Sequence, residues 1–95
     1  MSMKDAYTQK LRAQFDEWNA EIERLKAKAD AANADAKIEY YEQIDSLRKE
    51  QLAAQEKLSE LQGASETAWE DLKAGVESAW DSLEHAVKKA ASRFD

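Results

Sequence analysis

The most regular hydrophobic pattern of the chain lies at residues 69–94, where apolar positions recur every eleven residues. Trp69 is followed by Trp80, Leu72 by Leu83 and Phe94, Val76 by Val87, and Ala79 by Ala90. Eleven residues complete three turns at about 3.67 residues per turn, so each copy returns to the same face of a helix. The pattern therefore predicts an amphipathic helix over 65–94 that packs one apolar stripe against another surface.

A second pattern covers the first two thirds of the chain, where apolar residues alternate at intervals of three and four. The stripe is about 80° wide, which is typical of a coiled-coil seam. Such a narrow stripe favours a seam shared between chains. The predicted self-association seam, with its C-terminal continuation, comprises Leu11, Phe15, Trp18, Ile22, Leu25, Tyr40, Ile44, Leu47, Leu58, Leu61, Trp69, Leu72, Val76, Trp80, Leu83, Val87 and Phe94.

Two stretches decide how many helices the chain forms. The alanine-rich segment 27–36 contains neither glycine nor proline, so we expect a continuous helix over 4–62 that begins at a cap such as Ser2 or Asp5. The alternative is a turn at 31–33 with Asn33 as the cap of a further helix. Gly63 can end a helix in the left-handed conformation, and Ser65 can cap the next one.

These signals predict an all-α protein with a single helical domain over 1–95. We expect a long helix at about 4–62, a break near 63–64 and a helix at about 65–94, assembled as a coiled-coil or helical-bundle homo-oligomer. The alternative is a three-helix bundle with breaks near 31–33 and 63. In either arrangement Ile38, Tyr41 and Leu52 lie almost opposite the seam, either as scattered surface residues or as a second contact surface.

Composition and charge limit the partners. The chain has 95 residues, a net charge of −6, no cysteine and no proline, and alanine makes up 18 positions. An acidic chain without clustered Lys and Arg is not expected to bind nucleic acid. No signal peptide or membrane span is apparent, so we expect a cytoplasmic protein. A membrane surface is a less favoured partner, since the polar face of 66–84 carries six acids and one lysine.

The search for chemical sites gives no candidate. His85 is the only histidine and falls on the polar face, with Asp81 one turn before it and Ser82 where a di-iron motif needs Glu. We therefore expect no catalytic residue, no metal, no cofactor and no small-molecule substrate.

Three segments carry a resemblance: LRAQFDEWNAEIERLKAKAD at 11–30, DAKIEYYEQIDSLR at 35–48 and AWEDLKAGVESAWDSL at 68–83. They are similar to a family of small bacterial coiled-coil proteins associated with stress responses. The resemblance implies a bacterial, stress-associated coiled-coil protein, and it brings no enzyme activity or cofactor.

The function expected from the sequence is a non-enzymatic structural or interaction protein that self-associates through its apolar seam. The alternative is an amphipathic helical protein that acts at membrane surfaces or protects other components, because eleven-residue repeats with tryptophan also suit an interfacial helix.

Overall fold

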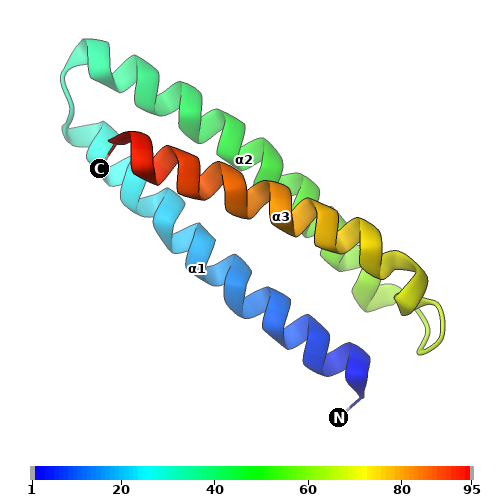
Figure 1. The fold of residues 1–95 in the computed structure, drawn as a ribbon. Helices are drawn as coiled ribbons and strands as arrows, with labels where there is room; N and C mark the ends of the chain where they lie inside the picture. Colours follow the sequence, from blue (N-terminus) through cyan, green and yellow to red (C-terminus); the bar gives the residue numbers. More distant parts are fainter. Residues whose placement is uncertain (1, 95) are drawn as a thin grey trace.

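The computed structural model describes residues 2–94, which form three helices folded into an up-down-up bundle (Figure 1). Helix α1 spans Met3–Ala31, α2 spans Ala34–Gly63 and α3 spans Trp69–Phe94. The bundle measures 51 × 20 × 18 Å. The start of α1 and the end of α3 lie at opposite ends of this rod, as expected for an odd number of antiparallel helices.

The expected continuous helix over 4–62 is wrong, because the chain turns at residues 32–33. Ala32 takes an extended conformation, and its N–H donates to Ala29 O at 3.1 Å. Asn33 is the N-cap of α2, its side chain accepting from Ala36 N at 3.0 Å. The high helix propensity of alanine is worth only tenths of a kcal/mol per residue. It is outweighed by the apolar surface that α1 and α2 bury against each other once the chain turns back.

The second break is real but is placed differently from the prediction. Gly63 is the last residue of α2 and does not have a positive φ, so it does not act as a left-handed cap. The connection runs from Ala64 to Ala68, and Ser65 Oγ accepts from Ala68 N at 3.1 Å. Ser65 thus closes the turn before α3, which begins at Trp69 and not at 65.

Polar contacts reinforce the end of α2 and the start of α1. The last turn of α2 carries no basic residue, although its unpaired carbonyls favour a positive charge. The Lys4 ammonium supplies that charge from the start of α1, donating to Gln62 O at 3.2 Å and to Ala64 O at 2.7 Å. Ser2, one of the two caps that the sequence offered, caps α1 itself by accepting from Asp5 N.

The core runs along the axis of the rod and draws on all three helices. Its fully buried side chains include Ile22 and Leu25 from α1, Leu47 and Leu61 from α2, and Leu83 from α3. The contact between α2 and α3 is the most extensive and that between α1 and α3 the least. Helix α1 can therefore hold its place with a narrow stripe, since it packs chiefly on α2.

Candidate functional site

All seventeen residues of the predicted self-association seam lie in the core of a single chain. Thirteen are buried, and the other four (Phe15, Tyr40, Leu72 and Phe94) are partly buried against them. The sequence analysis expected these residues to join separate chains, and in this structure they form the contact surface between the helices of one chain. The contacts described here join α1, α2 and α3 of one molecule, so the seam can be satisfied without a second chain.

Aromatic pairs connect the helices along the rod. Trp80 of α3 packs against Phe15 and Trp18 of α1, with ring centroids 5.9 and 6.2 Å apart. At one end of the bundle Tyr7 lies 5.8 Å from Trp69. At the other end Tyr40 stacks on Phe94, while Arg93 donates to Glu39. The tryptophans are therefore anchors of the core.

Tyr7 carries the largest pKa shift of the bundle. Its hydroxyl donates to Glu77 Oε1 at 3.1 Å. Burial, this hydrogen bond and the negative charges of Glu77 and Asp81 together raise the pKa of Tyr7 to about 12. The phenol is held neutral, so it acts as a hydrogen-bond donor between α1 and α3.

A polar network interrupts the core between α1 and α2. Gln51 is only 9% exposed, and its Nε2 donates to Asn19 Oδ1 at 2.8 Å. Arg48 Nη1 donates to Gln51 Oε1 at 2.8 Å, and Arg48 Nη2 donates to Glu23 Oε1 at 2.5 Å. The sequence showed Gln51 as an interruption of the seam but gave no sign of its partners. These contacts fix the register of α2 against α1.

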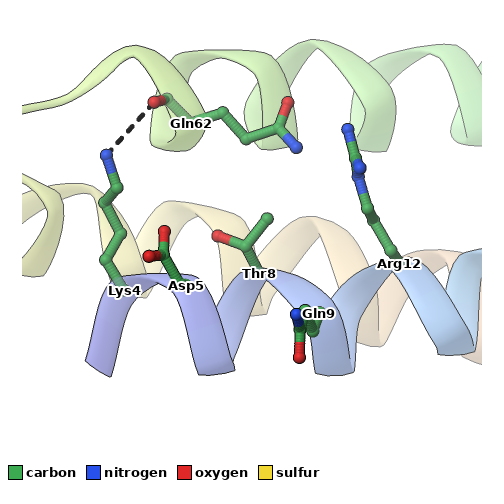
Figure 2. A pocket seen from close by; sticks show the side chains of 6 residues that line it. All are labelled: Lys4, Asp5, Thr8, Gln9, Arg12 and Gln62. Atoms are coloured by element: carbon green, nitrogen blue, oxygen red, sulfur yellow. Dashed lines mark hydrogen bonds between the residues drawn. The ribbon is translucent and has the colours of Figure 1, made fainter. Parts of the chain in front are cut away.

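A polar hollow of about 500 Å³ opens between the start of α1 and the end of α2 (Figure 2). Lys4 and Arg12 bring two positive charges to it, but both have partners. Lys4 donates to backbone carbonyls, and Arg12 donates to the side-chain oxygen of Gln62 at 2.8 and 3.0 Å once that amide is turned. Thr8 Oγ1 is buried there without a hydrogen-bond partner within 2–94. Of the residues that line the hollow, Lys4, Arg12 and Gln62 thus join α1 to α2.

The exposed apolar side chains form the most distinctive surface feature. Ile38 is 62% exposed, Leu52 58% and Tyr41 38%. All three lie on α2 and face away from the core, as the sequence placed them. Asp45 and Lys49 lie between them on the same side, and both are exposed. We call these five residues (Ile38, Tyr41, Asp45, Lys49 and Leu52) the α2 outer face.

One hydrogen bond fixes part of the α2 outer face. The Tyr41 hydroxyl donates to Asp30 Oδ1 near the end of α1. This bond and the charge of Asp30 raise the pKa of Tyr41. The ring is therefore tethered in one position before anything binds to it, which lowers the entropy lost on binding.

His85 lies on the exposed surface of α3. Within the part of the chain that the structure describes, no group of three or more His, Cys, Asp or Glu side chains is arranged to hold a metal ion. In that same part, none of the helices combines the length and the hydropathy needed to cross a membrane.

No protein-family model, curated protein or solved structure matches this chain. The resemblance to small bacterial coiled-coil proteins stays a prediction that rests on the three quoted segments.

Proposed function

We propose that this protein is a non-enzymatic interaction module that docks a partner on the α2 outer face. The observation that carries the proposal is the placement of exposed apolar residues. Ile38, Tyr41 and Leu52 gather on one side of one helix, and Met3 is the remaining large apolar residue left exposed within 2–94. Apolar side chains grouped on one face mark interaction surfaces more often than isolated ones do.

The design of the bundle supports this proposal. The seam residues form the core, and Ile38, Tyr41 and Leu52 are not among the residues that pack against it. The face spans the fifteen residues from Ile38 to Leu52, about 21 Å along the helix. That length is sufficient for a helix of a partner to lie along four turns.

Three further expectations from the sequence stay predictions: the stress-associated role, the bacterial source and the cytoplasmic location. Action at a membrane surface is also untested. In the closed bundle the indoles of Trp18, Trp69 and Trp80 are buried, so an interfacial role for them would require the helices to separate.

Site-specific photo-cross-linking in the host cell tests the proposal. A photoreactive residue in place of Leu52 should give a discrete cross-linked product, whereas the same residue in place of the exposed Ser82 on α3 should not. Equal products at both positions, or none at position 52, would overturn the proposal. Mass spectrometry of the product identifies the partner as a second copy of this chain or as another protein.

A further inference from the structure

We propose that the partner on the α2 outer face is a second copy of this chain, paired antiparallel through α2. This inference rests on the proposed docking function and adds to it the identity and the orientation of the partner. The pairing is isologous, which means that the same surface is used by both copies around a two-fold axis. Each residue contact must then occur twice, and the α2 outer face meets that requirement.

The charges on the α2 outer face decide the orientation. Asp45 and Lys49 are exposed, and neither has an ion-pair partner among residues 2–94. Parallel pairing in register would place Asp45 beside Asp45 and Lys49 beside Lys49 of the other copy. Like charges in such positions oppose association. Antiparallel pairing instead places Lys49 next to the acids Glu42 and Asp45 of the other copy.

The apolar residues agree with the same register. When the two-fold axis passes between residues 45 and 46, position 52 of one copy lies beside positions 38–41 of the other. Leu52 then enters the gap between Ile38 and Tyr41, and the second Leu52 does the same on the opposite side of the axis. Two apolar clusters result, with the Lys49 contacts between them. In this register the two Asp45 side chains meet at the axis, but one Lys49 ammonium lies on each side of them, whereas parallel pairing would also bring the two lysines together.

The size of this surface predicts a weak dimer. Specific interfaces that are stable bury about 1,200 Å² or more in total. One helix face against its copy falls near or below this limit, so we expect a dimer that dissociates on dilution through the micromolar range. The bundle itself remains folded as a monomer because its seam is internal.

Sedimentation equilibrium over a dilution series tests the association. The wild type should change from dimer to monomer, and Leu52→Ser should raise the dissociation constant about tenfold or more through the loss of a buried leucine. Met3→Ser, which removes the exposed apolar residue outside α2, is the matched control and should leave the dissociation constant unchanged. Far-UV circular dichroism verifies that each variant is folded. A wild type that is monomeric throughout, or an equal effect of Met3→Ser, overturns the inference.

Disulfide cross-linking tests the orientation, and the absence of cysteine from the natural sequence gives a clean background. Ala34→Cys and Ser59→Cys lie at exposed positions that the antiparallel register brings together. A mixture of the two variants should cross-link about tenfold faster than either variant alone. Faster cross-linking of each variant with itself would indicate parallel pairing and overturn the inference. A cellular photoproduct of position 52 with a different protein would also overturn it, yet would leave the docking function standing.

Discussion

At the scale of single residues, the structure depends on polar groups placed inside an apolar seam. Asn19 is the acceptor for Gln51, and Arg48 joins both side chains to Glu23. Buried polar groups cost stability when a partner is lost, because the remaining group is left without a hydrogen bond. They also discriminate between registers, since a shift of α2 by one turn would separate the two amides.

We expect Asn19→Leu to lower the free energy of unfolding by about 1–3 kcal/mol, because Gln51 loses its acceptor. The double variant Asn19→Leu/Gln51→Leu should be less destabilised than the single one, since both polar groups are replaced by apolar ones. Urea unfolding of the wild type, both single variants and the double variant measures this coupling. Additive effects would show that the two amides do not depend on each other.

Tyr7 predicts a pH dependence on the alkaline side. Its pKa is about 12 in the folded chain, against 10.0 for an ordinary tyrosine. The folded state therefore holds a proton that the unfolded state releases, so the stabilisation is complete below pH 10 and falls as the pH rises from 10 through 12. Tyr7→Phe should flatten the loss of stability in this window relative to the wild type, as measured by urea unfolding at each pH. If the stability of Tyr7→Phe and of the wild type fell equally between pH 10 and 12, Tyr7 would not be the group responsible. Tyr40→Phe, at the opposite end of the bundle, is the control.

At the scale of the elements, the ends of the helices were harder to predict than their faces. The alternation at three and four residues identified the core residues of α1 and α2 because the period of a helix fixes which side chains share a face. The turn at 32–33 carries an asparagine cap, which the sequence offered as one of two readings. The packing of α1 on α2 favours the turn over the continuous helix. This is a tertiary interaction, which the helix propensity of single residues does not include.

Asn33→Ala should lower the free energy of unfolding by about 1 kcal/mol, because Ala36 N loses its acceptor at the start of α2. Asn33→Asp keeps an acceptor and is the control. Both variants should remain compact bundles in small-angle X-ray scattering. An extended particle formed by Asn33→Ala would show that this one cap decides between the bundle and a continuous helix.

The two glycines predict gains in stability. Gly63 and Gly75 lie within helices, neither has a positive φ, and an added Cβ would meet no atom within 4 Å at either position. Alanine restricts the unfolded chain more than glycine does, so Gly63→Ala and Gly75→Ala should each raise the free energy of unfolding by about 0.5–1 kcal/mol. Ala74→Gly, at an exposed position next to Gly75, should lower it by a similar amount. Destabilisation by Gly63→Ala would indicate that Gly63 needs a conformation closed to alanine.

At the scale of the whole molecule, the radius of gyration is 15.3 Å and the long axis is 51 Å. A continuous helix over 4–62 would measure about 88 Å. The all-α class and the residues of the core follow from the sequence. The sequence does not show whether the apolar stripe of a helix is covered by its own chain or by another chain, because both arrangements bury the same residues. The polar network and the contacts of Lys4 likewise depend on side chains that meet only after the chain has turned back.

The aromatic contacts predict that the bundle unfolds as one unit. Trp80 is buried in α3 but packs on Phe15 and Trp18, so its removal weakens the attachment of α1 as well as α3. Trp80→Ala should cost about 3–5 kcal/mol, a large share of the 5–15 kcal/mol that stabilises a typical domain. We expect far-UV circular dichroism and the fluorescence of Trp18 and Trp69 to report the same transition, shifted to lower urea.

The exposed Ser82 lies two residues along α3, and Ser82→Ala is the control, with an expected change of at most about 0.5 kcal/mol. At a urea concentration where the wild type is intact, Trp80→Ala could lose only the helical signal of α3 while α1 and α2 stay folded. That result would contradict cooperative unfolding. That result would mean that α1 and α2 form a stable pair without α3. The aromatic contacts argue against it, because Phe15 and Trp18 would then lose the Trp80 surface that covers them.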